Sequence, residues 1–480
     1  MKKRAIVWFR RDLRLADNPA LCAALDGDFD TVVPVFIEAP DELGDEAPGG
    51  AQRVWQHFSL AALAADLEAL GSRLIIRRGP SADALDRLIE ESGATAVYWN
   101  RLYDPHTIER DKRVKAHLDD QSIETASFPA HLLYEPWTVS TRQNAPYKVF
   151  TPFWKAVRDR PVATPLAAPS ELPAVWDRIG SESLDALGLL PDIRWDEGIR
   201  EAWTPGEAGA HDRLDHFVDD VLGRYATDRD RPAVLGTSYL SPHLHWGEIG
   251  PRQVVHRVEE WLAEHGRDGD RADANTFLSE IGWREFAHHV LYHFPETPER
   301  PLDTRFESFP WSGDDEGLAR WQRGTTGIPM VDAGMRELWA TGYMHNRLRM
   351  TVASFLTKNL RVAWQHGERW FWDTLVDADL ANNTLGWQWA AGCGADAAPF
   401  FRIFNPARQG ERFDPDGHYV RRWVPELANL DAKHIHAPWA APGKALADAG
   451  VVLGDTYPEP IVDLKASRRE ALAAFDQVKK

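Results

Sequence analysis

The chain has 480 residues and a mass of 54.2 kDa, enough for roughly two to four domains with a sizeable core. Cys22 and Cys393 are its only cysteines, which excludes a disulfide framework and a cysteine zinc site and favours a reducing compartment. The apolar run that follows Lys2 and Lys3 is too short for a signal peptide, and no run approaches the roughly 18 residues of a membrane span. We therefore expect a cytoplasmic protein that does not contact the membrane.

The charge balance is acidic and uneven. The 73 acidic and 55 basic side chains give a net charge of −18, which argues against non-specific nucleic-acid binding. Only 12 of the basic side chains are lysine, a composition that favours a saline cytoplasm, where salt screens charge repulsion; an acidic mesophilic enzyme is the alternative. Residues 341–422 carry 10 basic and 8 acidic side chains. A face that meets a polyanion is therefore expected in this segment.

The first 130 residues alternate short β-rich runs with amphipathic stretches. Buried strands are predicted at residues 5–9, 31–37, 73–77 and 95–99. A helix is predicted over 81–91, with Ser81 as its N-cap and Gly93 just beyond its end. This alternation predicts a doubly wound, parallel-sheet α/β domain over residues 1–130. Neither GxGxxG after the first strand nor GxxxxGK[ST] occurs, so a bound nucleotide is expected elsewhere.

The rest of the chain divides into a connector and a helical part. Residues 131–205 are rich in Pro, Ala and Trp and are interpreted as a long interdomain connector. Helical periodicity dominates residues 206–480, most clearly at 275–294, 330–341, 348–364 and 368–377. The predicted fold class is thus α/β plus all-α.

The 21 tryptophans are unusually many, and several lie beside polar residues in the helical part. A large helical core explains most of them; a stacking platform or a relay of indoles is the alternative. Helical spacing places Glu280, Trp283 and Arg284 on one face, and Asn346, Arg349 and Met350 on another. Two carboxylates, two asparagines and two indoles lie within residues 377–389. Each pattern alone is explained equally well by a salt-bridged helix face.

Together, these runs belong to an ordered set of motifs that resembles the DNA photolyase and cryptochrome family. The set comprises VWFRRDLRL at 7–15, YKVFTPF at 147–153, GTSYLS at 236–241, IGWREF at 281–286, MHNRLRM at 344–350, residues 377–389, DAAP at 396–399 and FRIFNP at 401–406. The resemblance spans nearly the whole chain and is to the class I branch, which repairs cyclobutane pyrimidine dimers. It implies that residues 206–480 form a helical domain that binds FAD and the DNA lesion, and that residues 1–130 form an antenna-chromophore domain.

The resemblance also implies which residues hold the cofactor. Contacts to the phosphate and ribose region are implied for Tyr225, Thr237, Ser238, Tyr239, Leu240 and Ser241. Arg349 is expected to pair with Asp377, with Asp379 and Asn346 nearby, and Asn383 to face the flavin N5. An ordinary buried ion pair is the alternative for Arg349 and Asp377.

The implied activity is that of a deoxyribodipyrimidine photo-lyase, in which light drives an electron from fully reduced FAD to the dimer, without a metal. The resemblance implies that the lesion is flipped out of the duplex, because its reacting atoms cannot be reached inside the base stack. Trp283 and Trp389 are then the expected walls of its pocket, Met350 adds apolar contact and Glu280 hydrogen-bonds a pyrimidine edge. The positions expected near DNA are Arg229, Arg284, Asn346, Arg347 and Gln409, and the expected partner is UV-damaged DNA bound by a monomer.

The resemblance also implies roles for three tryptophans, and four histidines need a separate interpretation. Trp387, Trp364 and Trp311 match the family's electron-relay indoles, with core packing as the alternative for each. His243 and His245, and His289 and His293, are interpreted as structural rather than as zinc ligands, because no HExxH accompanies them.

Other activities remain as alternatives. Members that repair the (6-4) photoproduct place two histidines where this chain has Asn346 and Met350. A blue-light sensory cryptochrome would typically carry Asp or Cys in place of Asn383, and an ordinary flavin oxidoreductase would carry a Rossmann fingerprint. Tyr343 stands where bacterial relatives often have Trp. The antenna chromophore is left open between a deazaflavin, towards which residues 52–54 lean, methenyltetrahydrofolate, and none.

Overall fold

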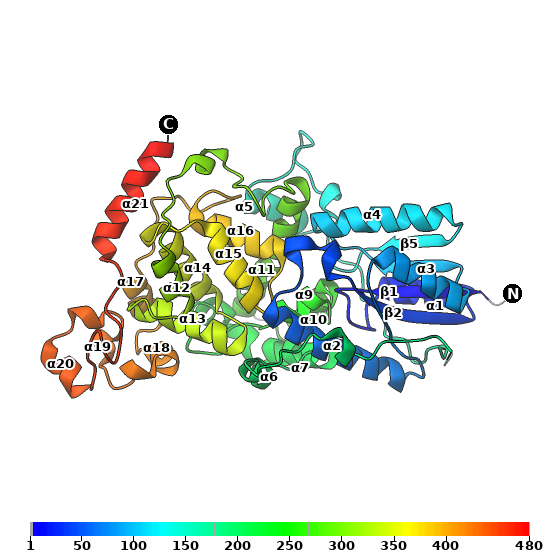
Figure 1. The fold of residues 1–480 in the computed structure, drawn as a ribbon, viewed down its shortest axis with the longest axis horizontal. Coiled ribbons are helices and arrows are strands. Elements are labelled where there is room, and N and C mark those ends of the chain that lie inside the picture. The colour runs from blue at the N-terminus through cyan, green and yellow to red at the C-terminus, as the bar shows by residue number, and fades with distance from the viewer. Residues whose placement is uncertain (1–2, 176–177, 267, 480) are drawn as a thin grey trace. The chain divides into compact units, whose positions relative to one another are not determined.

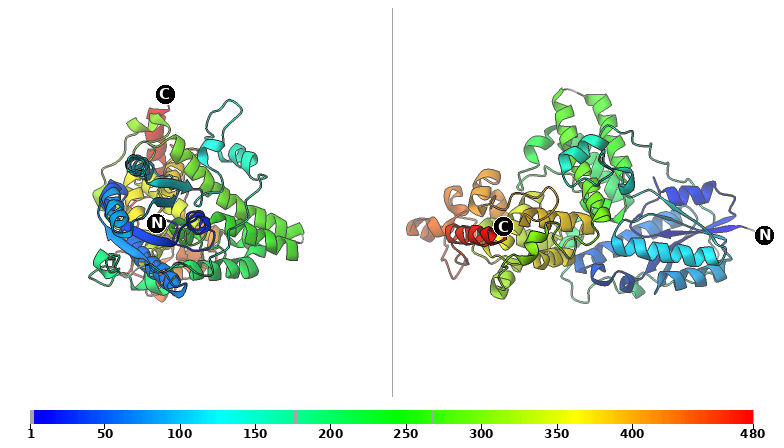
Figure 2. Two further views of the ribbon diagram at one scale, coloured as in Figure 1. Left: turned by 90° about the vertical axis from the view of Figure 1, so that its right-hand side faces the viewer. Right: turned by 90° about the horizontal axis from the view of Figure 1, so that it is seen from above.

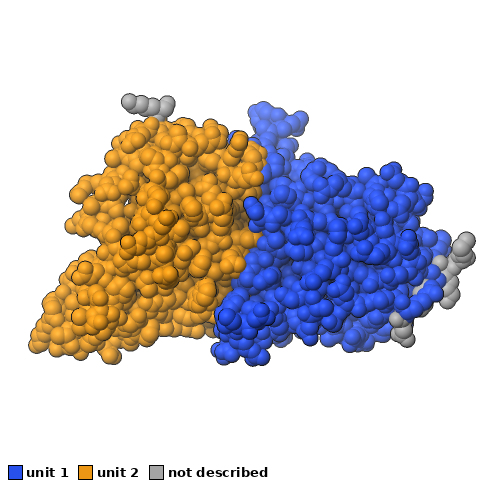
Figure 3. Space-filling model, viewed as in Figure 1, with its two compact units in different colours: residues 1–223, 238–295 blue, residues 224–237, 296–480 orange. Residues whose placement is uncertain are grey.

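A computed structural model describes residues 3–175, 178–266 and 268–479 of the chain (Figure 1). The chain divides into two compact units: unit 1 is residues 1–223 and 238–295, and unit 2 is residues 224–237 and 296–480 (Figure 3). The units do not follow the predicted boundaries near residues 130 and 205, because the connector hydrogen-bonds to the sheet domain. The Leu172 N–H donates to the Leu70 carbonyl oxygen, and the Glu182 N–H to that of Ile76, each over 3.0 Å. None of the described helices combines the length and apolar character needed to cross a bilayer.

Unit 1 contains a five-stranded, all-parallel sheet, which confirms the predicted sheet domain. Its strands are β1 (Arg4–Phe9), β2 (Thr31–Glu38), β3 (Ile75–Arg78), β4 (Ala96–Asn100) and β5 (Glu124–Phe128), in the order β3-β2-β1-β4-β5. Four strands lie where the hydrophobic runs predicted them, to within two residues. The edge strand β5 was missed because its sequence, ETASF, is polar and no residue in it is fully buried.

The sheet is covered by helices that follow the strands (Figure 2). These helices are α1 (Pro19–Asp26), α2 (Gly50–Ala69), α3 (Ser81–Ser92) and α4 (Pro105–Asp120). Leu85 and Leu88 of α3 and Leu118 of α4 pack with Trp8 in one apolar layer. Gly93 ends α3 at φ 66°, as predicted. The predicted N-cap is wrong: Ser81 is the first residue of α3, and its hydroxyl donates to the Glu42 carboxylate instead, 2.5 Å away.

The crevice at the carboxyl ends of β1 and β4 is the usual ligand site of such a sheet, because the strand order reverses there. Here it is filled by polar side chains. The Asn100 amide donates to Asp12 Oδ2 over 2.6 Å and to Asn18 Oδ1 over 2.8 Å, and the Arg10 guanidinium donates to the Asn100 carbonyl oxygen. This network agrees with the absence of a dinucleotide fingerprint.

The remaining helices of unit 1 are α5 (Phe150–Val157), α6 (Glu197–Ala202), α7 (Glu207–His216), α9 (Ser241–Trp246), α10 (Pro251–His265) and α11 (Asp268–His293). Those of unit 2 are α8 (Tyr225–Asp228), α12 (Asp315–Gln322), α13 (Pro329–Thr341), α14 (Asn346–Ser354), α15 (Trp364–Thr374), α16 (Leu380–Ala391), α17 (Pro406–Phe413), α18 (His418–Trp423), α19 (Ala432–Ile435), α20 (Gly443–Asp448) and α21 (Leu464–Val478). Helix α13 lies where periodicity predicted it, whereas α11 begins seven residues before its predicted start at residue 275. The predicted mostly helical second part is confirmed.

One predicted helix, residues 348–364, is interrupted. After α14 the chain forms a π-helical turn, η8 (Phe355–Asn359), and Arg361 then adopts a positive φ of 55°. Few residues other than glycine adopt this conformation, and it ends the helix before α15 begins at Trp364. Helix α15 therefore starts four residues earlier than predicted and also ends earlier, at Thr374. Apolar periodicity continues across the break because both segments bury one face in the core of unit 2.

Candidate functional site

Helix α14 and the loop before α16 are joined by an ion pair of unit 2. Arg349 Nη2 lies 2.8 and 3.0 Å from the two carboxylate oxygens of Asp377, as the resemblance predicted. Arg349 Nε donates to the Met344 carbonyl oxygen over 2.7 Å, and the guanidinium stacks over the Tyr343 ring at 5.3 Å. Asp377 is almost fully buried, whereas about a quarter of the Arg349 side chain is exposed. Of the two charged groups, only the Arg349 guanidinium is therefore partly accessible.

Helix α16 begins with two of the predicted cofactor residues. Asp379 is its N-cap and accepts from the Asn382 backbone N–H over 2.9 Å. Asn383 is buried, and its side-chain amide donates to the Glu368 carbonyl oxygen over 3.0 Å. This bond fixes the Asn383 amide from α15 and turns its donor group towards the protein.

Glu368 was not among the predicted site residues. Its carboxyl accepts from the Thr384 hydroxyl over 2.5 Å, and burial raises its pKa to about 8. A carboxyl that remains protonated at neutral pH therefore contacts Thr384, the residue that follows Asn383. No local sequence pattern distinguishes Glu368 from a surface glutamate, since its burial depends on packing between α15 and α16.

The predicted phosphate and ribose residues are divided between the units. Tyr225 and Thr237 belong to unit 2, and Ser238, Tyr239, Leu240 and Ser241 belong to unit 1. The Thr237 hydroxyl is buried without a hydrogen-bond partner among the described residues, as expected of a group that serves a ligand. Tyr239 has a positive φ of 53°, a strained conformation that is frequent at binding loops.

The three predicted relay tryptophans all lie in unit 2. Trp387 and Trp364 are buried in its core, and Trp311 packs against that core while partly exposed. A bridge between Ser312 and Val362 joins the chain segments that carry Trp311 and Trp364. The Trp387 indole N–H finds no acceptor in the described part of the chain. The burial thus runs from a partly exposed indole to fully enclosed ones.

Trp387 is held tightly in place. Its ring lies 5.0 Å from that of Phe371 and 6.0 Å from that of Trp321, both nearly edge-on. A Cβ at Gly367 would approach the indole within 2.1 Å, so only glycine fits there. This packing equally satisfies the requirements of an ordinary core residue.

The lesion residues predicted in unit 1 lie on α11. Trp283 is half-buried and stacks on Phe150, with ring centroids 3.9 Å apart and planes 11° from parallel. Arg284 is buried and donates to the His131 carbonyl oxygen over 2.8 Å. The guanidinium therefore has partners inside unit 1, which suits a supporting role better than direct contact with DNA. Glu280 is half-buried.

The lesion residues predicted in unit 2 lie on three helices and one preceding turn. Asn346, at the start of α14, is exposed, whereas Met350, Trp389, Gln409 and Arg229 are half-buried. Arg347 is less accessible than expected of a phosphate contact. It pairs with Asp230, and its guanidinium stacks over the Phe413 ring at 4.3 Å.

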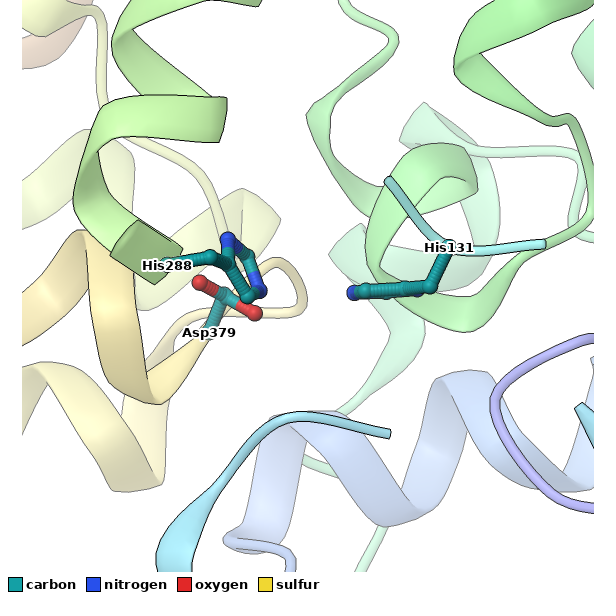
Figure 4. Close-up of side chains that lie close together, drawn as sticks. All are labelled: His131, His288 and Asp379. Atoms are coloured by element: carbon teal, nitrogen blue, oxygen red, sulfur yellow. The ribbon is translucent and has the colours of Figure 1, made fainter. Parts of the chain in front are cut away.

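The predicted structural histidines have protein partners. His243 Nδ1 lies 2.5 Å from Glu248 Oε2, and the His289 ring accepts from the Tyr147 N–H over 3.0 Å. Two further histidines of unit 1, His131 and His288, meet edge-on with centroids 5.2 Å apart (Figure 4). Within unit 1 alone, no third described histidine, cysteine or carboxylate completes a metal-binding group with them.

These features define a protein that joins a parallel-sheet domain to helices suited to a flavin. Residues 5–171 match the DNA photolyase family model, and residues 277–477 match the model of the FAD-binding domain of DNA photolyase. The chain is 50% identical to the deoxyribodipyrimidine photo-lyase of Agrobacterium fabrum over 99% of its own length and 98% of that protein. It is 40% identical to cryptochrome-1 of Arabidopsis thaliana, covering 99% of this chain and 71% of that protein.

A solved structure gives the same result. The crystal structure of a bacterial class III photolyase from Agrobacterium tumefaciens matches with a TM-score of 0.95 and 49% identity, over 100% of this chain and 98% of that one. This chain therefore belongs to the DNA photolyase and cryptochrome family. The class I branch expected from the motifs is not confirmed, since this similar structure is of class III.

Proposed function

We propose that the protein is a photolyase that uses reduced FAD and light to repair cyclobutane pyrimidine dimers in DNA. The observation that carries the proposal is the pairing of Arg349 with Asp377 immediately before α16. This one helix holds Asn383 near its start and both Trp387 and Trp389 near its end. A charged clamp and an oriented amide are protein groups that can position a flavin and tune its electronics.

The chain's residues fit FAD, and the buried Thr237 hydroxyl is a direct sign of this. When bound, reduced FAD supplies the electron that opens the cyclobutane ring. Arg349 and Asp377 would hold the polar edge of the ring system. One N–H of the Asn383 amide donates to the Glu368 carbonyl oxygen and fixes the orientation of the amide, and its Oδ1 would accept a hydrogen bond from an N–H of the cofactor.

The electron relay is assigned to Trp387, Trp364 and Trp311. Their graded burial supports transfer from the surface towards the cofactor.

Contacts to the lesion are assigned to Trp283, Trp389, Met350 and Glu280. The Phe150 stack pre-organises Trp283, so little side-chain entropy is lost when a flipped base packs on it. DNA contacts are assigned to Arg229, Asn346, Arg347 and Gln409, with Arg284 supporting α11 through His131.

Within the family, we assign the chain to class III rather than class I, on its 49% identity to the class III structure. A sensory cryptochrome is the second candidate, favoured by the 40% identity to the Arabidopsis protein. Asn383 favours repair, because the resemblance associates Asp at this position with plant cryptochromes. Asn383 thus supports repair over signalling.

We further propose a cytoplasmic monomer, adapted to salt, with a deazaflavin or methenyltetrahydrofolate antenna. In the run 52–54, which the sequence associates with a deazaflavin, Gln52 and Val54 on α2 are buried and Arg53 is exposed.

The test uses purified, reduced protein and two oligonucleotides, one with a thymine cyclobutane dimer and one with a (6-4) photoproduct. Intact thymines are measured after blue light and after darkness. Recovery from the first substrate, in light only, supports the proposal. A protein that is folded, FAD-bound and reduced but repairs neither would favour the sensory alternative.

A further inference from the structure

Lys358, in the π-helical turn η8, is a buried lysine without a counter-ion. Only 1% of its surface is exposed, and no described carboxylate pairs with it. Its ammonium donates to the Arg402 carbonyl oxygen over 3.3 Å and lies 5.2 Å from the centroid of the Phe400 ring. Burial of an unpaired charge costs free energy unless hydrogen bonds compensate for the lost hydration. The segment that supplies the partners of the ammonium is therefore important for understanding the role of Lys358.

Both partners belong to the segment 394–404, which joins α16 to α17. This segment has almost no regular structure. At its end, the Phe404 N–H donates to the Ser354 hydroxyl over 3.2 Å, one helical turn before Lys358. The α14–η8 face thus holds the segment at two points, Arg402 and Phe404.

The segment buries Phe400 and exposes the two residues that follow it. Phe400 is buried and stacks on Phe475 with centroids 4.6 Å apart. Its neighbour Phe401 is 61% exposed, and the Arg402 side chain is also exposed. A large exposed phenylalanine beside an arginine is suited to contact with unstacked bases and phosphates. The segment also connects the helix of Trp389 to the helix of Gln409, both assigned above to lesion binding.

We propose that Lys358 is a positioning residue for lesion recognition, whose ammonium holds the segment 394–404 so that Phe401 and Arg402 face the damaged DNA. The inference rests on the proposed function. Lys358 itself does not touch DNA, because it is enclosed; it acts through the Arg402 carbonyl group.

The hold depends on the charge of Lys358. Burial lowers the pKa of Lys358 to about 8, with Cys393 and Arg402 as the ionisable groups that act on it. The ammonium form is therefore present at neutral pH and is lost above pH 8. The hydrogen bond to Arg402 weakens with it, since a charged donor binds more strongly than a neutral amine.

The experiment measures binding of the full-length protein to dimer-containing DNA in the dark, between pH 6.5 and 9.5. Four proteins are compared: wild type, K358M, K358R and the exposed control K465M. Wild type and K465M should bind more weakly above pH 8. The DNA affinity of K358R should not change between pH 6.5 and 9.5, because a guanidinium keeps its charge over this range. K358M should bind about ten-fold more weakly at pH 7, the loss typical of one charge-assisted hydrogen bond.

Stability gives a second readout that a merely structural residue would not produce. Removal of a buried, unpaired charge should leave the urea midpoint of K358M equal to or above that of wild type, while its DNA binding falls. Glu368 also titrates near pH 8, so the difference between variants, rather than the wild-type profile alone, is decisive.

Two results would overturn the inference. One is K358M that binds dimer DNA as tightly as wild type at pH 7; the other is K358R with the same loss above pH 8 as wild type. A wild-type protein that does not prefer dimer DNA at all would overturn the proposed function together with it.

Discussion

Replacement of Asp377 by Asn tests the clamp on which the proposed cofactor site depends. Arg349 Nη2 makes two contacts with the Asp377 carboxylate, at 2.8 and 3.0 Å, and Asp377 is almost fully buried. Loss of one partner of a buried pair costs about 3–5 kcal/mol. Because Arg349 is a quarter exposed and Asn retains one acceptor, we expect D377N to lower the free energy of unfolding by about 2 kcal/mol.

The assay is urea unfolding, followed by far-UV circular dichroism and by FAD release. The matched control is E470Q, which breaks the exposed pair of Glu470 with Arg361 in the same unit, at 3.4 Å, and should cost less than about 1 kcal/mol. A double variant, R349M with D377N, removes both charges and should recover part of the loss. Equal, small losses in D377N and E470Q, with FAD retained by both, would refute the reasoning.

Three further predictions concern the same unit. Burial raises the pKa of Glu368 to about 8, so this carboxyl opposes folding increasingly as pH rises from about 4.5 to 8. Stability curves at several pH values should show that E368Q flattens this decline and is more stable than wild type by roughly 2–4 kcal/mol at pH 8.5; parallel curves would contradict the assignment. G367A should lower stability by roughly 1–3 kcal/mol and slow flavin photoreduction, because its Cβ would meet the relay indole at 2.1 Å. G386A, with open space around its Cβ, should be neutral or stabilising, and equal effects would refute the packing argument. W389A should weaken dimer binding in molar salt far more than R347A, since salt already suppresses phosphate contacts; equal losses at that salt would contradict this.

Much of the fold could be predicted because hydrophobic periodicity reports burial directly. The strands near residues 5–9 and 31–37 are continuous apolar runs, and both faces of the parallel sheet are buried. The edge strand β5 was not predicted, because an edge position does not require apolar residues. The helix break at Arg361 was not predicted, because the positive φ of this residue does not change the pattern of apolar residues.

The candidate site was predictable where residue identity itself carries the chemistry. The pairing of Arg349 with Asp377 was expected from ordered motifs and is present, whereas the role of Asp379 as the N-cap of α16 was not predicted. Glu368 and Lys358 were not expected, because a charged residue is usually at the surface and only packing between distant segments reveals that these are enclosed. The partners of Arg284 inside unit 1 were hidden for the same reason, since its carbonyl acceptor lies 153 residues away in sequence.

The most direct test of the central claim is recovery of intact thymines from an oligonucleotide with one cyclobutane dimer, using reduced wild-type protein in high salt. The account predicts recovery that grows with blue-light dose and is absent in darkness. No recovery at any dose, from protein that is folded and holds reduced FAD, would contradict it.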